Sequence, residues 1–102
     1  MTQYDYHAID DLIHSRIRLS ILALLVTRIK ASFTEIKNQV GASDGNLSIH
    51  IRKLEQAEYV SVNKKFINRK PLSMYTITDK GRSAFNHYIE HIESLLKIGE
   101  LQ

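Results

Sequence analysis

The stretch that decides the fold is SDGNLSIHIRKLE, residues 43–55. Leu47, Ile51 and Leu54 recur at i, i+4 and i+7, and this spacing predicts a helix over residues 43–57 with one buried face. Ser43 or Asp44 can cap its start, because either side chain can accept a hydrogen bond from a free backbone N–H. The opposite side is mostly polar and carries Asn46, Ser48, Ile49, Arg52 and Lys53.

A shorter helix is expected just before this stretch, over residues 34–40. Ser32 and Glu35 have the spacing of a capping box, and Thr34 is the other candidate for the cap. Gly41 follows where a glycine commonly ends a helix. Two helices joined by a tight turn around Gly41 are typical of a helix-turn-helix motif.

A first helix and a β-hairpin are predicted on the two sides of this motif. Ile13, Ile17 and Ile21 belong to an apolar stripe with helical spacing, which predicts a helix over residues 10–28. The period changes to two from residue 59, and the turn-forming residues 68–71 separate two strands of a hairpin over residues 59–77. Three aromatic side chains could be base-stacking platforms or part of the hairpin core, and we assign them to the core: Tyr59, Phe66 and Tyr75.

The last predicted element is a helix over residues 79–97, which Thr78 and Asp79 can cap. The chain of 102 residues contains 43% hydrophobic residues and no recognisable linker, so we expect a single domain over residues 1–102. The predicted fold class is mainly α with a small β-hairpin (α+β). The predicted order is helix, short strand, helix, helix, strand, strand, helix, which describes a winged helix-turn-helix.

The excess positive charge lies in one window. Between residues 43 and 70 there are six bases and three acids, which account for the whole net charge of +3. A local positive field of this kind attracts polyanions, although a solvated basic surface would give the same composition. Together with the helix-turn-helix, this charge favours binding to double-stranded DNA.

The polar face of the helix over 43–57 would then enter the major groove as a recognition helix. Its expected contact residues are Ser43, Gly45, Asn46, Ser48, Ile49, Arg52 and Lys53. Asn46 and Ser48 can read base edges, whereas Arg52 and Lys53 suit phosphates or a guanine edge. The hairpin would be the wing, with Arg69 suited to a minor groove. The expected wing contacts are Lys64, Lys65, Asn68, Arg69 and Lys70.

Three segments resemble winged-helix transcriptional regulators of the MarR/ArsR superfamily. They are FTEI at 33–36, the stretch at 43–55 and YTITDKGR at 75–82. The run Ser48-x-His50-Ile51-x-x-Leu54 is similar to the recognition helix of the ArsR branch. One departure is Glu58, where the family usually has a glycine before the aromatic residue. If that position is left-handed, Glu58 costs about 1 kcal/mol relative to glycine.

The resemblance implies a homodimer that regulates transcription, most often as a repressor, and that pairs through the first and last helices. The long apolar stripe of the last helix supports such pairing independently of the resemblance. The expected interface residues are Leu12, Ile13, Phe85, Tyr88, Ile89, Ile92, Leu95 and Leu96. The other interpretation of this stripe is packing within its own domain.

Other function classes find little support in the sequence. The chain has no Cys, no paired carboxylates in an apolar segment and no phosphate-binding loop, so we expect no enzyme and no cofactor. We also expect no membrane segment and a cytoplasmic location. The sequence does not identify an effector. One alternative is a winged-helix protein-interaction module that does not bind DNA. Another is a metal-responsive regulator, with ligands from one helical face: His87, Glu90 and His91.

Overall fold

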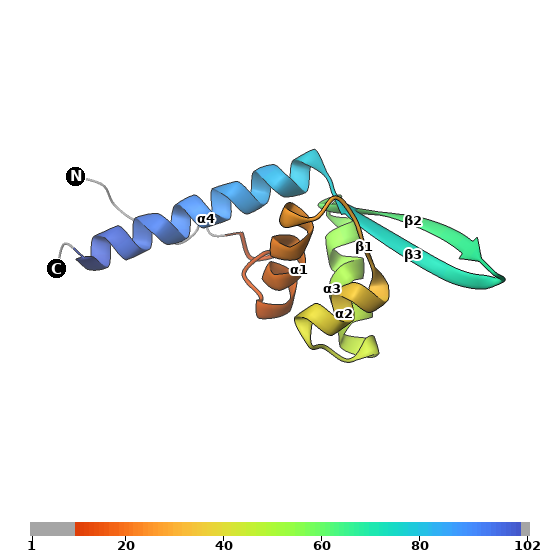
Figure 1. Cartoon of the computed structure of the whole chain (residues 1–102). Coiled ribbons are helices and arrows are strands. Elements are labelled where there is room, and N and C mark those ends of the chain that lie inside the picture. Colours follow the sequence, from red (N-terminus) through yellow and green to blue (C-terminus); the bar gives the residue numbers. More distant parts are fainter. Residues whose placement is uncertain (1–9, 101–102) are drawn as a thin grey trace.

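The computed structural model describes residues 10–100 of the chain (Figure 1). Its elements are α1 (Arg16–Thr27), β1 (Ala31–Ser32), α2 (Phe33–Val40), α3 (Asp44–Gln56), β2 (Val60–Ile67), β3 (Lys70–Ile77) and α4 (Asp79–Glu100). The strands form one antiparallel sheet in the order β1-β3-β2. This architecture confirms the predicted fold class. The β2–β3 hairpin and α4 extend in opposite directions from a body made of α1, α2 and α3.

The core forms where α3 meets the two helices before it. Leu47, Ile51 and Leu54 of α3 are almost completely buried, as their spacing predicts. They belong to one cluster with apolar residues of α1 and α2, namely Ile21, Leu22, Leu25 and Ile36. Burying a large aliphatic side chain stabilises the fold by about 1.5–3 kcal/mol. This cluster therefore holds the helix-turn-helix against α1.

Local capping sets the limits of α2 and α3. The Ser32 hydroxyl accepts from the Glu35 N–H at 3.1 Å, and the Glu35 carboxylate accepts from the Ser32 N–H at 3.0 Å. This reciprocal pair is the predicted capping box. Gly41 ends α2 in the left-handed conformation, with φ 75°. Ser43, rather than Asp44, caps α3 by accepting from the Asn46 N–H at 3.2 Å.

The first helix begins later than predicted. It starts at Arg16 instead of residue 10, because Ser15 adopts an extended backbone and caps it. Residues 10–15 form a separate turn, in which Asp10 Oδ1 accepts from the N–H groups of Leu12 and Ile13 at 2.9 and 3.3 Å. Ile13 is nevertheless fully buried, so the apolar stripe continues through this turn.

The hairpin turn is shorter than predicted. Only Asn68 and Arg69 lie between the strands, both with positive φ (51° and 64°), whereas a turn over residues 68–71 was expected. Two left-handed residues produce the twist that a two-residue hairpin needs. Pro71 therefore lies in β3, opposite Phe66. It is tolerated there because this part of β3 has a free edge, where no N–H is needed for pairing.

The assignment of Phe66 to the hairpin core is wrong. Its side chain is 78% exposed, whereas Tyr75 is buried as predicted and Tyr59 is partly buried. The reason is that the helical body buries only the part of the hairpin nearest to it, where Val60 and Tyr75 lie, whereas residues 63–71 are all exposed. β1 also pairs with β3 only at Met74 and Tyr75. The hairpin beyond these residues is a two-stranded ribbon without a third strand, and Phe66 lies near its tip.

The start of α4 is held against the turn that follows α3. Thr78 Oγ1 accepts from the Gly81 N–H at 2.9 Å and donates to the Glu58 carbonyl at 2.6 Å. A Cβ at Gly81 would lie 2.1 Å from the Tyr59 carbonyl oxygen, so only glycine permits this approach. α4 then continues to Glu100, three residues beyond the predicted end. Among the described residues, no helix is both long and apolar enough to cross a membrane.

A polar contact also joins α3 to α1. Arg18 Nη1 lies 2.8 Å from His50 Nδ1, and Arg18 Nε donates to the Leu12 carbonyl. Arginine has no acceptor atom, so Nδ1 must accept and His50 must be neutral with its proton on Nε2. Burial, followed by the charges of Arg18 and Lys53, lowers the pKa of His50 below its usual 6.5. Sequence reasoning missed this contact, because the two residues are far apart in the chain.

We expect Glu58→Gly to stabilise the protein. Glu58 has φ 63°, so the left-handed conformation considered for this position is present. Glycine adopts this conformation without the steric cost, although it loses more backbone entropy on folding. The free energy of unfolding in urea should rise by about 1 kcal/mol. Glu58→Ala, which removes the charge but keeps a Cβ, is the control and should give a much smaller gain.

We expect stability to fall with acid through His50. The unfolded state takes up a proton near the usual pKa of 6.5, whereas the folded state resists it. The stabilisation is therefore complete above 6.5 and is lost as the pH falls towards the lower folded pKa. The measurement is urea unfolding between about pH 8 and about pH 5. His50→Gln should flatten this slope relative to the wild type, and an unchanged slope would contradict the assignment.

Candidate nucleic-acid interface

The outward side of α3 is mostly polar and is exposed to solvent. Every recognition-helix residue predicted to touch DNA is exposed: Ser43, Gly45, Asn46, Ser48, Ile49, Arg52 and Lys53. A Cβ added at Gly45 would meet no atom of another element within 4 Å, so the backbone of the first turn of α3 is exposed there. The three buried residues of α3 lie on the other side and fix this orientation.

The structure brings part of the hairpin next to this face. Ser48 and Arg52 of α3 and Lys64 of β2 line one hollow of about 150 Å³, with Phe33 and Tyr75 among its other walls. Glu55 also lines it and places one carboxylate among the bases. Residues from the predicted recognition helix and the predicted wing therefore form one continuous surface.

The outer hairpin, residues 64–72, carries the remaining predicted wing residues. Lys65, Asn68, Arg69 and Lys70 are exposed, together with Lys64. Strand alternation places Lys64 and Lys65 on opposite faces of the ribbon. The two strands and their turn, residues 60–77, contain four bases and no acid. This segment is therefore a projecting arm with a charge of +4.

The one acid at the start of α3 is paired. Lys37 Nζ lies 2.7 Å from Asp44 Oδ1, so α2 supplies a counter-charge for Asp44. Ser43 caps α3, so the Asp44 carboxylate is not needed as the cap. Asp44 instead makes this ion pair and lies in the first turn, where a carboxylate interacts favourably with the helix dipole. The repulsion that Asp44 would exert on a polyanion is reduced accordingly.

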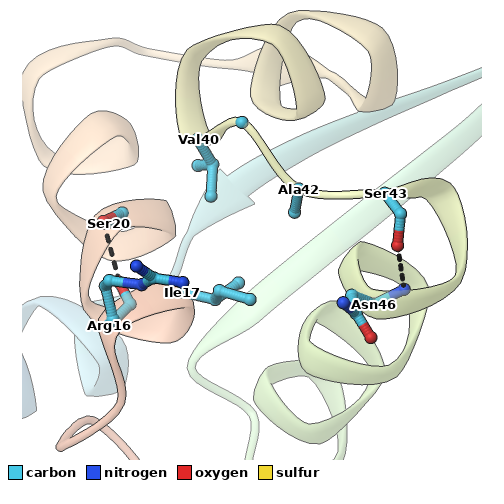
Figure 2. A pocket seen from close by; sticks show the side chains of 8 residues that line it. Arg16, Ile17, Ser20, Val40, Ala42, Ser43 and Asn46 are labelled. Atoms are coloured by element: carbon cyan, nitrogen blue, oxygen red, sulfur yellow. Dashed lines mark hydrogen bonds between the residues drawn. The ribbon is translucent and has the colours of Figure 1, made fainter.

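A second hollow lies beside the first turn of α3 (Figure 2). It has a volume of about 290 Å³ and lies between α1, the turn at Gly41 and the first turn of α3. Arg16 at the start of α1 and Asn46 of α3 line it from opposite sides. Arg16 lies outside the basic sequence window, so sequence reasoning did not place this base beside α3.

The predicted interface residues, in α4 and in the turn before α1, divide into three groups by their exposure. Ile89, Leu95 and Leu96 are exposed, at 36%, 45% and 62%. Leu12, Phe85 and Ile92 are partly buried against the core, whereas Ile13 and Tyr88 are buried within the protomer. Tyr88 Oη also lies 2.9 Å from His14 Nδ1 and ties α4 to the turn before α1. Ile13 and Tyr88 can thus serve an interface only by supporting the residues beside them.

The candidate metal ligands do not form a site in the described residues. No group of three or more His, Asp or Glu side chains there is placed to hold a metal ion, and this includes His87, Glu90 and His91. The His91 Nδ1 atom is buried without a hydrogen-bond partner. A single unpartnered imidazole nitrogen does not supply the ligand set that zinc requires.

Comparisons with known proteins agree with this fold. The sequence is 38% identical over 84 residues to an uncharacterized protein of Methanocaldococcus jannaschii (MJ0432), a match that covers 82% of this chain and 91% of that protein. The structure is similar to a transcriptional regulator homologue of Pyrococcus horikoshii, with a TM-score of 0.78, 29% identity and coverage of 84% and 85%.

A MarR-family transcriptional regulator of Silicibacter pomeroyi has the same fold, with a TM-score of 0.65 and 17% identity; the match covers 81% of this chain and 55% of that one. Residues 17–96 match the winged helix DNA-binding domain family. The expected resemblance to winged-helix regulators is thereby confirmed. The match includes α2, α3, the hairpin and most of α4, and the chain belongs to the winged helix DNA-binding domain family.

Proposed function

We propose that this protein is a homodimeric, sequence-specific DNA-binding regulator of transcription that acts in the cytoplasm, most simply as a repressor that occludes a promoter. The observation that carries the proposal is the joint surface of Ser48, Arg52 and Lys64. There the exposed face of α3 continues into an acid-free basic hairpin. The proposal includes no catalytic step and no cofactor.

The two parts of this surface suit different parts of a duplex. α3 presents amide and hydroxyl groups at Asn46 and Ser48, which can pair with base edges in a major groove. Arg52 and Lys53 follow one turn later and suit the flanking phosphates. The two-stranded outer hairpin carries its bases away from the body, where they can reach the backbone or the minor groove beside the α3 site.

The exposed part of α4 supports the homodimer. Phe85, Ile92 and the buried Tyr88 pack on the core, and the same apolar spacing continues outward through Leu95 and Leu96. Figure 1 shows this half of α4 extending beyond the body. A second copy could cover this stripe by a self-complementary contact. Two copies would present two α3 helices to half-sites about one helical turn apart, about 10 bp.

Binding to DNA is tested with duplexes selected from a random library, by fluorescence anisotropy across a salt series. We expect the selected duplex to bind about 10³-fold more tightly than a scrambled one. Arg52→Ala and Arg69→Ala should each weaken binding and reduce the salt slope by about one, the loss of one phosphate contact. Arg82→Ala, an exposed base on α4, is the matched control. Equal and weak binding to all duplexes would instead favour a protein-interaction module.

The dimer is tested by light scattering after size exclusion. Leu96→Glu places a charge in the exposed stripe, and we expect the mass to fall from two chains to one. Because Leu96 is 62% exposed in the protomer, the fold should tolerate this change. Ile29→Glu is the control, since Ile29 is 90% exposed but lies after α1, away from the stripe. A wild-type mass of one chain would refute the homodimer without affecting the DNA surface.

A further inference from the structure

An aromatic side chain lies exposed among the bases of the outer hairpin. Phe66 is 78% exposed and follows Lys64 and Lys65 directly in β2. Arg69 lies in the two-residue turn, and Lys70 follows it at the start of β3. An apolar ring of this size normally lies in a core or against a partner. Here the ring of Phe66 lies on the outer hairpin, and the positive charge of this hairpin attracts a polyanion.

The direction of Phe66 follows from the register of the hairpin. Alternation along β2 places it on the same face as Lys64, which lines the hollow beside Arg52 of α3. Phe66 therefore continues the face that adjoins α3, roughly 7 Å further along the strand than Lys64. Ile67 lies on the opposite face, paired with Lys70.

Pro71 is the cross-strand neighbour of Phe66. Its ring fixes φ and removes one backbone freedom from the strand that supports the aromatic side chain. The tight turn at Asn68 and Arg69 closes the ribbon after one more pair, Ile67 with Lys70. Phe66 thus lies in a paired two-stranded ribbon rather than in a loop.

We infer that Phe66 acts as a wedge that enters a groove of the bound duplex, partly unstacks one base step and kinks the DNA. This inference rests on the proposed function, since it requires that the outer hairpin meets a duplex. The four bases of the hairpin are neutralised by phosphates, but an uncharged ring gains nothing from them. It is buried only against sugars and base faces, and an apolar wedge at a base step is a known means of bending DNA.

The charge of the hairpin residues around Phe66 favours a DNA duplex as the partner. Between residues 60 and 77 there is no acid, so the charged groups of the hairpin around the ring are all positive, which favours a polyanionic surface. A duplex offers both the phosphates for the bases and stacked apolar faces for the ring. The wedge then adds binding energy that does not depend on salt, beside phosphate contacts that do.

The test measures both the bending of the bound duplex and the affinity of the protein for it. A selected duplex with a donor and an acceptor dye at its ends reports the bend by energy transfer, and 2-aminopurine at successive steps reports unstacking. Wild-type protein should shorten the end-to-end distance and raise 2-aminopurine fluorescence at one step. Phe66→Ala should abolish both signals and weaken binding about tenfold, as expected for one lost stacking contact. Its salt slope should stay unchanged, because no charge is removed.

The matched control is Ile67→Ala, which removes an exposed apolar residue, 52% exposed, from the opposite face of the ribbon. It should keep the bend. Both variants should retain the wild-type free energy of unfolding in urea, which shows that any change in binding is local.

The remaining outcomes separate this inference from the proposed function. If wild-type protein binds the duplex without bending it, or if Phe66→Ala bends it fully, the wedge is overturned and the DNA-binding function stands. If no selected duplex binds even at low salt, the result overturns both the wedge and the proposed DNA-binding function. Sedimentation with phosphatidylserine vesicles covers the other anionic surface. Vesicle binding that is lost in Phe66→Ala, with duplex binding unchanged, would assign the ring to a membrane and overturn the wedge.

Discussion

The structure depends on the burial of one face of α3. Leu47, Ile51 and Leu54 lie in the core with residues of α1 and α2, and each contributes about 1.5–3 kcal/mol through the apolar surface removed from water. A helix that buries one face in this way must leave the other at the surface. The same contact therefore stabilises the fold and exposes the side chains that can meet DNA. Arg18 adds a polar link at the same junction through its contact with His50.

The β2–β3 hairpin and α4 form the two ends of the molecule, and the two ends have different surface chemistry. The hairpin extends to one side of the helical body with an acid-free charge of +4, and α4 extends to the other with an apolar stripe (Figure 1). A charged arm suits a polyanion, whereas an apolar stripe suits a second copy of the chain. The locked junction at Thr78 and Gly81 lies between them, where α4 begins against the backbone of Tyr59. Movement of one end relative to the other would have to change this junction.

Several local features could be predicted from sequence because their causes are local. The capping box of Ser32 and Glu35, the glycine at the end of α2 and the buried spacing of α3 each depend on residues within a few positions of one another. The start of α1 was missed because the apolar stripe runs on through residues 10–15, while Ser15 ends the helical backbone there. The turn was misjudged because Lys70 and Pro71 have turn-forming character, yet two left-handed residues already reverse the chain.

The sequence by itself determined the helix-turn-helix, the hairpin and the window of excess charge, since periodicity, caps and composition are properties of adjacent residues. Only the tertiary structure decided which of these residues share a surface. The grouping of Ser48 and Arg52 with Lys64, and the placing of Arg16 beside α3, require elements distant in the chain to pack together. The exposure of Phe66 has the same origin. Its alternation marks it as a core residue, but the helical body does not cover this part of the hairpin, and burial depends on what covers a strand as well as on the strand's own pattern.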